Sequence, residues 1–268
     1  MNIERSVETT WQPSRRLSRG GAAEQILEDL RARILDGQLP RGARLPTEKQ
    51  LAEGYGVSGP TVREAIRGLT TANLVEVRHG SGAYVTADPD QLIGAALMSM
   101  MQLERVGIAE VLGVLGVLNA YAAELAATRA SEDDIQAMKD ALVQIDTAAD
   151  ATDIADGLRR FIDALGKASG NVLLAVLCRF LAGVQVALGK QLTGDVFESW
   201  RKTTRVLAKD RQRLVDAIAA HDVVAARDAA RKHSAHSTKV IASLPHAHDT
   251  MLSDPAMASL LASMLQQR

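Results

Sequence analysis

The sequence predicts a mainly α-helical chain in which short N-terminal helices and one small β-hairpin precede a C-terminal all-helical bundle. Apolar residues recur at helical spacing through most of the 268 residues. Only one pair of short β-rich runs is evident, between residues 74 and 86, and a glycine-rich segment joins them. Aromatic residues make up 3% of the chain, so Ala, Leu, Val and Ile must build most of the core, which favours packed helices.

Length and composition indicate a soluble globular protein of two domains, because 268 residues are 47% hydrophobic and 24% charged. No uninterrupted apolar run reaches the roughly 18 residues of a membrane span, and no apolar signal core is present at the N-terminus. We therefore expect a cytoplasmic protein without a membrane partner. The single cysteine, Cys178, lies in an apolar run, which predicts a buried thiol.

The net charge of −1 gives no general affinity for nucleic acid. Residues 1–87 carry 12 Lys and Arg against 10 Asp and Glu, whereas residues 88–268 carry 19 against 22. Any affinity for DNA must therefore come from charges that are arranged locally on one face.

The N-terminal segment, residues 1–20, contains four arginines and no hydrophobic period, which predicts a flexible basic arm. The arm either adds phosphate contacts or is a disordered tail without such a role. Residues 22–35 then have the apolar spacing of an amphipathic helix.

The stretch LAEGYGVSGPTVREAIRGL, residues 51–69, predicts two short helices joined by a glycine-containing turn. Ser58 is the expected N-cap of the second helix, and Pro60 suits its first turn. The apolar residues of this helix follow the i, i+3, i+4, i+7 pattern of a buried stripe: Val62, Ala65, Ile66 and Leu69. Its other face carries Thr61, Arg63, Glu64 and Arg67. The arrangement is that of a helix-turn-helix whose second helix enters the DNA major groove.

Two β-rich runs follow, residues 74–77 and 83–86, joined by Arg78-His79-Gly80-Ser81-Gly82. This pattern predicts a β-hairpin with a glycine-rich tip, which would form a wing beside the helix-turn-helix.

Residues 19–87 resemble the winged helix-turn-helix domain of the GntR family of bacterial transcription regulators. The resemblance rests on an ordered set of residues: Gly42, Leu45-Pro46, Glu48, Val57-Ser58, Val62-Arg63-Glu64-Ala65, Leu69 and the glycines of the wing. It implies a DNA-binding domain over residues 21–87 and double-stranded operator DNA as the partner.

Combined with the resemblance, the pattern assigns DNA binding to Lys49, Ser58, Thr61, Arg63, Arg67, His79 and Gly80. Thr61 is expected to contact a base edge or a phosphate, and Arg63 to make a bidentate contact to guanine. Lys49 is expected to bind phosphate, whereas Arg67 either faces DNA or pairs with Glu64. The resemblance implies that His79 and Gly80 reach the minor groove.

One position departs from the family pattern. The residue after Val57-Ser58 is commonly basic in the family, but here Gly59 and then Pro60 follow. A contact to DNA is thereby lost, which puts the usual operator sequence of the family in doubt. The alternative interpretation of Arg63 is a solvated surface arginine.

Beyond the break at residues 87–90, the period stays helical and predicts a bundle over residues 91–245. Residues 246–268 are expected to form a tail or a short helix. The predicted helices cover approximately residues 108–129, 131–149, 154–168, 171–190, 195–220 and 223–243.

The segments FIDALGKASGN and RQRLVDAIAAHDVVAARDAARKH resemble the helical effector-binding FCD-type domain of the FadR subfamily of GntR regulators. Many such domains hold a metal with one Asp and three His. An ungapped alignment places Leu158, Ile162 and Arg211 at three of these positions and leaves only His233. One ligand cannot hold a metal, so we predict neither metal nor other cofactor. We interpret His236 and the pair His246 and His248 as surface histidines, and a metal cluster with His233 is the alternative.

Leu112 stands where the resemblance implies an arginine that faces a ligand carboxylate. Leu112, Leu158 and Ile162 thus replace polar anchors by aliphatic side chains. We therefore expect a hydrophobic effector such as a fatty acid or acyl-CoA, with Arg211 and His233 as polar anchors. The alternative is a collapsed pocket that binds no ligand.

Together these features predict a transcription regulator, expected to be a repressor, that binds a palindromic operator as a homodimer and responds to an effector. The alternative is a constitutive or architectural DNA-binding dimer without an effector. The sequence contains no nucleophile elbow, phosphate-binding glycine loop or metal-ligand set that would indicate an enzyme.

Overall fold

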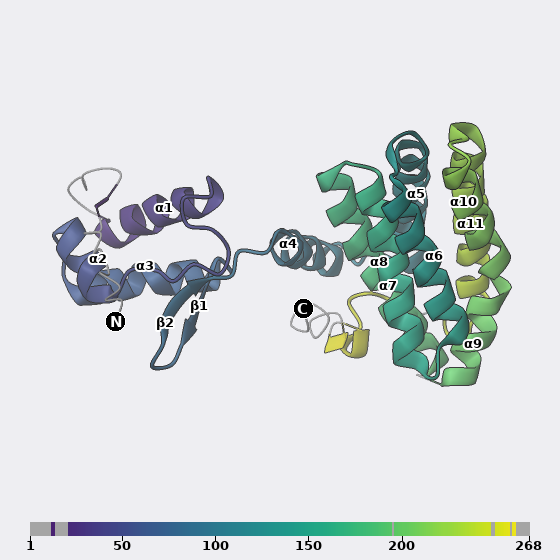
Figure 1. The fold of residues 1–268 in the computed structure, drawn as a ribbon. Coiled ribbons are helices and arrows are strands. Elements are labelled where there is room, and N and C mark those ends of the chain that lie inside the picture. The colour runs from purple at the N-terminus through teal and green to yellow at the C-terminus, as the bar shows by residue number, and fades with distance from the viewer. Residues whose placement is uncertain (1–11, 14–20, 195, 248–249, 258, 261–268) are drawn as a thin grey trace. The chain divides into compact units, whose positions relative to one another are not determined.

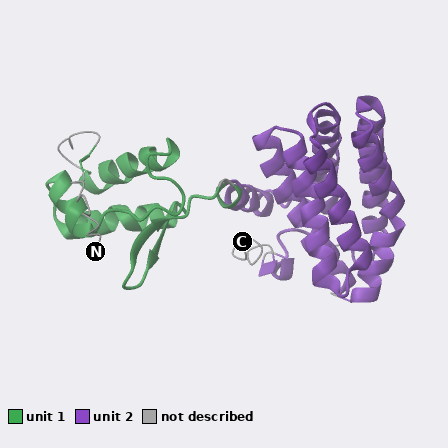
Figure 2. Cartoon of the chain, in the orientation of Figure 1, with its two compact units in different colours: residues 1–92 green, residues 93–268 purple. Residues whose placement is uncertain are grey.

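The computed structural model describes residues 12–13, 21–194, 196–247, 250–257 and 259–260. The chain divides into two compact units, residues 1–92 and residues 93–268 (Figure 2). The expected basic arm lies outside the described residues except for Gln12 and Pro13, and so do residues 261–268 of the expected C-terminal tail. Each unit is considered by itself below.

Within its described residues, the first unit contains three complete helices, one hairpin and the start of α4 (Figure 1). Its elements are α1 (Ala22–Leu35), α2 (Glu48–Tyr55), α3 (Gly59–Thr71), β1 (Val75–Arg78) and β2 (Gly82–Val85). The strands pair antiparallel from Val75↔Val85 to Arg78↔Gly82. The hairpin is therefore the predicted wing, although β1 begins one residue later and β2 one residue earlier than expected.

The core of this unit forms where α1 and α3 pack together, and α2 closes it. All four residues of the predicted apolar stripe on α3 are buried. Gly56 ends α2 with a φ of 68°, a left-handed conformation that glycine adopts at low cost. This position fixes the tight turn between the two helices of the predicted helix-turn-helix.

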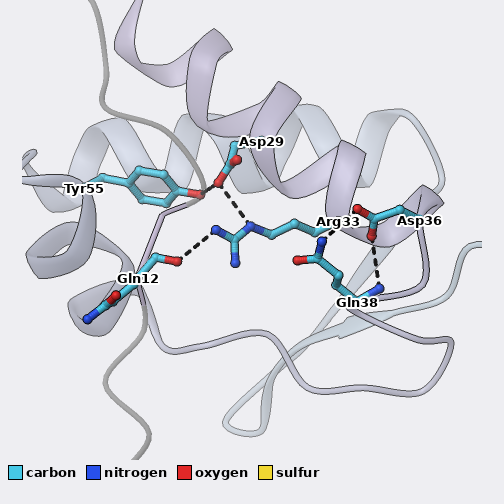
Figure 3. A network of polar contacts seen from close by, with 6 residues as sticks. All are labelled: Gln12, Asp29, Arg33, Asp36, Gln38 and Tyr55. Carbon is cyan, nitrogen blue, oxygen red and sulfur yellow. Dashed lines mark hydrogen bonds and ion pairs between the residues drawn. The ribbon is translucent and has the colours of Figure 1, made fainter.

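A buried carboxylate joins α1 to α2 (Figure 3). Asp29 of α1 accepts a 2.6 Å hydrogen bond from the Tyr55 hydroxyl of α2 and lies 3.3 Å from Nε of Arg33. Arg33 in turn donates from Nη2 to the carbonyl of Gln12 at 2.8 Å. The network therefore fixes α2 against α1 and attaches residue 12 of the N-terminal segment to the same helix.

The second unit is a helical bundle, as the sequence predicts (Figure 1). Helix α4 begins in the first unit and ends in the second. The helices are α4 (Pro89–Leu103), α5 (Ile108–Arg129), α6 (Glu132–Thr147), α7 (Ala151–Ala168), α8 (Val172–Thr193), α9 (Phe197–Val206), α10 (Ala208–Ala219) and α11 (Val223–Ala242). Residues 255–257 and 259–260 are also helical. Helix α5 packs most extensively on α11, and α6 on α7.

Two helices of the bundle, α5 and α8, are long and apolar enough to span a membrane by length and composition alone. Within their most apolar windows, 50% of α5 and 67% of α8 is buried inside the bundle. The core helices of soluble proteins have the same composition, so this feature is weak evidence for a membrane span. Cys178 on α8 is buried, as predicted, and burial raises the pKa of its thiol to about 11.

The prediction of one long helix over residues 195–220 is wrong, because the helix breaks at Leu207 and forms α9 and α10. The carbonyl of Thr204 does not continue the α-helical ladder. It accepts instead from the amide of Leu207 at 3.2 Å and from Nη2 of Arg211 at 2.7 Å. The side chain of Arg211 therefore takes over a carbonyl that an uninterrupted helix would have satisfied along its own axis.

The substitution Tyr55→Phe should destabilise the first unit by about 1.5–3 kcal/mol, since it leaves a buried carboxylate without one of its donors. Hydrogen exchange of α1 and α3 amides in the full chain would measure the loss. Tyr121→Phe is the matched control, because Tyr121 is exposed on α5. Equal protection in both variants would contradict the prediction.

Candidate DNA-binding surface and effector cavity

The outward face of α3 carries Thr61, Arg63 and Arg67, opposite the buried stripe. The Arg63 side chain is 61% exposed and lies 3.2 Å from a carboxylate oxygen of Glu48 at the start of α2. The ion pair is exposed, so it is weak and DNA can replace it. Arg67 is exposed too, and no ion pair among the described residues joins it to Glu64.

Ser58 lies at the N-cap position of α3 with an extended backbone, as predicted. Its hydroxyl makes no capping bond to a backbone amide and lies instead 2.8 Å from the Thr61 hydroxyl. Gly59 and Pro60 form the first turn between them. Thus the start of α3 presents two linked hydroxyls and no positive charge.

Lys49 is exposed to solvent in the first turn of helix α2. Among the described residues, the only ion pair of Lys49 is a long contact of 3.9 Å to Glu53. The sequence analysis missed the reason for this placement. Thr47 and Gln50 form a reciprocal capping box that starts the helix. The pattern T-x-x-Q before Leu51 could have indicated it.

The wing exposes His79 and Gly80 at its tip, and Gly80 has a φ of 71°. Below the tip, the Arg78 guanidinium lies over the Tyr84 ring at 4.8 Å and pairs with Glu76 at 3.2 Å. The Arg78–Tyr84 contact crosses the hairpin and stiffens it, whereas the pair with Glu76 lies within β1. His79 takes part in neither contact.

An exposed arginine that the sequence analysis did not assign, Arg44, lies beside the wing. Its backbone bridges to Tyr84, and a Cβ atom on Gly82 would lie only 2.9 Å from its Nε. The guanidinium therefore covers Gly82 and adds positive charge near the tip. Only the folded hairpin brings these residues together, which is why spacing along the sequence gave no signal.

The second unit contains a cavity of about 90 Å³ between α7, α8, α9, α10 and α11. Four of the five predicted effector residues line it: Leu158, Ile162, Arg211 and His233. The fifth, Leu112, lines a smaller neighbouring cavity of about 30 Å³. Both cavities share Ile162 and His233, so the predicted residues lie together in one region of the bundle.

Arg211 is the most unusual group in the cavity, because its side chain is fully buried at 2% exposure. One guanidinium nitrogen donates to the Thr204 carbonyl, but Nε has no hydrogen-bond partner. Within the described part of the chain, no carboxylate lies within ion-pair distance of the group, and only the more distant charges of Asp146 and Asp210 act on it. Burial lowers the pKa of Arg211 to about 10, so the side chain remains a cation at neutral pH.

His233 faces the same cavity, and its Nδ1 is buried without a hydrogen-bond partner. Burial, together with the nearby charge of Arg211, lowers the pKa of His233 to about 4. The imidazole is therefore neutral at pH 7. The cavity thus combines a cation, a neutral imidazole, aliphatic and aromatic side chains, and a few hydroxyl and amide groups.

His236, interpreted from the sequence as a surface histidine, has a side chain that is 40% exposed, but it also makes a hydrogen bond that the sequence did not indicate. Its Nδ1 lies 2.6 Å from a carboxylate oxygen of Asp210, and this hydrogen bond lowers the pKa of Asp210. Asp210 also contacts Arg213 at 3.3 Å. His246 is exposed, and His248 lies outside the described residues. Within the described ranges, no group of three or more His, Cys, Asp or Glu side chains could hold a metal ion.

The sequence analysis missed Trp200 of α9, which lines the cavity and has a buried indole N–H without a partner. Its ring packs on Gly189, where a Cβ atom would lie 3.4 Å from the indole. The predicted continuous helix over residues 195–220 gave no reason to expect Trp200 near Arg211.

Comparison with known proteins matches two families in order along the chain. Residues 22–85 match the bacterial regulatory proteins of the gntR family, and residues 110–236 match the FCD domain. The regulator Mce2R of Mycobacterium tuberculosis is 30% identical over 222 residues, which cover 80% of this chain and 89% of the relative. LutR of Bacillus subtilis is 28% identical, covering 75% of this chain and 92% of the relative.

Among solved structures, the GntR protein of Streptococcus agalactiae is similar, with a TM-score of 0.61 and 27% identity over 81% of this chain and 99% of that one. The fold, the exposed face of α3 and these relatives define the class: a DNA-binding transcription regulator and not an enzyme. The chain belongs to the GntR family of bacterial transcription regulators and carries an FCD effector-binding domain.

The pKa of His233 predicts a pH dependence of stability. The unfolded side chain has a pKa near 6.5 and the folded one about 4. The unfolded state therefore binds more protons between these values, so the neutral form stabilises the fold above about pH 6.5 and this stability is lost as the pH falls toward 4. The loss should reach up to about 3 kcal/mol.

Thermal unfolding between pH 7.5 and pH 4.5 would measure this effect. His233→Gln should flatten the dependence over that range, whatever its effect on absolute stability. His246→Gln, at an exposed position, is the control and should retain the wild-type slope.

Proposed function

We propose that this protein is a FadR-subfamily repressor that acts in the cytoplasm and binds a palindromic operator as a homodimer. A small apolar effector with an acidic group, bound in the cavity of the FCD domain, would change its affinity for the operator. The observation that carries the DNA-binding part is the outward face of α3, where Arg63 and Arg67 are exposed and Thr61 is half-buried, together with the exposed wing tip.

The need for two subunits follows from the size of the reading surface. One recognition helix contacts only a few base pairs, and a two-fold protein on a palindromic site roughly squares the discrimination. Gly59 and Pro60 also leave the start of α3 without a basic side chain. Discrimination between base sequences by each subunit would therefore depend on Arg63. Ser58 and Thr61 would contact the DNA through their hydroxyls, and Lys49 would bind a phosphate.

The chemistry of the effector follows from the cavity walls. Leu158 and Ile162 give the cavity an apolar side, which favours a hydrophobic ligand. No described carboxylate lies within ion-pair distance of Arg211, although the charges of Asp146 and Asp210 partly compensate it. A buried cation without a close anion is costly, so an acidic ligand beside it would be stabilised. An acidic head group beside Arg211, with an apolar tail among the aliphatic side chains, satisfies both conditions.

The cavity volume of about 90 Å³ limits the size of this ligand. It suits a short-chain acid without rearrangement, whereas a long fatty acid or the acyl group of acyl-CoA requires α9 or α11 to move. The small volume is also the observation that favours the second candidate function, a constitutive DNA-binding dimer whose cavity stays closed.

Arg63→Ala should weaken binding to the preferred operator by about 1–3 kcal/mol and relax base preference at one position of each half-site. Lys49→Ala should instead weaken binding to all sequences alike. The slope of the logarithm of the binding constant against the logarithm of the salt concentration should become shallower by about one unit. In vitro selection of binding sites followed by anisotropy titrations at several salt concentrations would measure both.

Arg31→Ala is the matched control for these variants, because Arg31 is an exposed arginine of α1 paired only with Glu28 in the same helix. If Arg63→Ala selects the same operator bases as the wild type, Arg63 is a solvated surface arginine and does not contact a base.

Straight-chain carboxylic acids from butanoate to palmitate, added to the protein bound to its selected operator, would test the effector. We expect release by the shorter acids, retention with the matching alcohols, and at least a roughly tenfold loss of acid affinity in Arg211→Met. Arg213→Met is the control, since Arg213 is exposed on the same helix. Operator affinity that no acid or acyl-CoA changes would favour the constitutive dimer.

A further inference from the structure

Helix α5 has an exposed apolar face that nothing in the chain covers within the described residues. Val114, Val117 and Tyr121 are all exposed, and Val117 is the most exposed of them at 70%. They lie on one side of a helix whose other side is buried in the core. A contiguous apolar surface of this kind on a soluble domain indicates an interaction site.

Beside this face, α5 and α11 form a shallow groove of about 520 Å³. Its floor is built from small residues, including Gly113, Gly116, Ser234 and Ala235. A Cβ atom on Gly116 would lie 3.2 Å from Cβ of Ser234, so any larger residue would make the contact between the two helices tight. The floor is therefore flat enough to accept the ridge of another helix.

We propose that the occupant of this groove is α5 of a second copy of this chain, crossing antiparallel about a two-fold axis at Val117. The inference deepens the proposed function and rests on its homodimer. It assigns the dimer contact of the FCD domain to the α5–α11 face.

The charges along the groove fit such a crossing. Glu110, Val117 and Glu124 are spaced seven residues apart, so they share one face of α5. A two-fold axis at Val117 places Glu110 of one copy opposite Glu124 of the other, and Arg227 and Arg231 line the groove at that end. Each end of the interface would then contain two carboxylates and two guanidinium groups.

Arg231 supports this arrangement, because it is exposed and makes no ion pair within the described part of the chain. Among the residues that the structure describes, Arg227 pairs only with its sequence neighbour Asp228, at 3.2 Å. Both arginines are thus able to meet Glu110 of the second copy.

The dimensions also fit. Helix α5 has 22 residues, which is about 33 Å of helix. With α11 beside it, the face measures about 33 Å by 20 Å, so two copies would bury on the order of 1,300 Å², which is within the size range of specific interfaces. The apolar centre with charged ends matches the usual build of such contacts.

The groove and the inner cavities share a wall. Leu112, Gly116, Ser234 and Thr238 line the groove and also the cavity of about 30 Å³ behind it. That cavity shares His233 with the larger one. One layer of side chains therefore separates the proposed dimer contact from the proposed effector, so a ligand that displaces α11 acts on the interface directly.

Val117→Arg tests the contact, since it places two arginines against each other on the two-fold axis. We expect the dimer dissociation constant, measured by sedimentation velocity on the full chain, to rise by at least about 100-fold. Val143→Arg is the matched control, because Val143 is 60% exposed on α6. It should leave the dimer unchanged, and a dimeric Val117→Arg variant overturns the inference.

Val117→Cys provides a second test that does not depend on destabilisation. A residue on the two-fold axis lies against the same residue of the second subunit. Mild oxidation should therefore link two Val117→Cys subunits by a disulfide, whereas Val143→Cys should stay unlinked. The native Cys178 is buried and does not interfere. If Val117→Arg dissociates but Val117→Cys forms no crosslink, the antiparallel register centred on Val117 is overturned.

The wild-type protein separates failure of this inference from failure of the proposed function. A wild-type dimer that both Val117 variants leave unaffected overturns the inference alone. A wild-type monomer that binds its selected operator one subunit at a time overturns the homodimer as well. A monomer that binds phosphatidylglycerol vesicles, and loses this binding in Val117→Arg, assigns the α5 face to a membrane surface and also overturns the inference.

Discussion

The burial of one guanidinium group determines much of the FCD domain. Arg211 caps the Thr204 carbonyl, and the helix breaks at Leu207. The break separates α9 from α10, and Trp200 of α9 lines the cavity together with Arg211. The same charge helps to keep His233 neutral. A single buried cation thus shapes the backbone, forms one wall of the cavity and sets the protonation of its neighbour.

Much of the fold could be predicted from the sequence, because most elements follow local rules. The apolar stripe of α3 predicts its buried face, and the capping box at Ser131 predicts the start of α6. The break at Leu207 could not be predicted in this way. At the break, the side chain of Arg211 binds a carbonyl seven residues earlier, a contact that helical periodicity along the sequence does not indicate.

The candidate sites divide in the same way. Residues on one helix, such as Thr61 and Arg63, could be assigned from spacing because helix geometry fixes which side chains share a face. Arg44 beside Gly82 and Trp200 beside the cavity could not, since both come close to the site only through tertiary folding. Likewise, the ungapped alignment found Arg211 and His233, but the sequence did not show that Arg211 lacks an ion pair.

A regulator needs a physical link between its ligand and its DNA-binding geometry, and a ligand shifts that geometry only if it binds two arrangements differently. An anion that reached Nη2 of Arg211, and not only the unpartnered Nε, would compete with the Thr204 carbonyl for that donor. Withdrawal of that donor would leave the last turn of α9 less constrained and move α11 through the walls that both cavities share. Because α11 also forms one side of the groove beside α5, this displacement would reach the proposed subunit contact through the α5–α11 packing. The coupling would therefore depend on a competition between two acceptors for one buried cation.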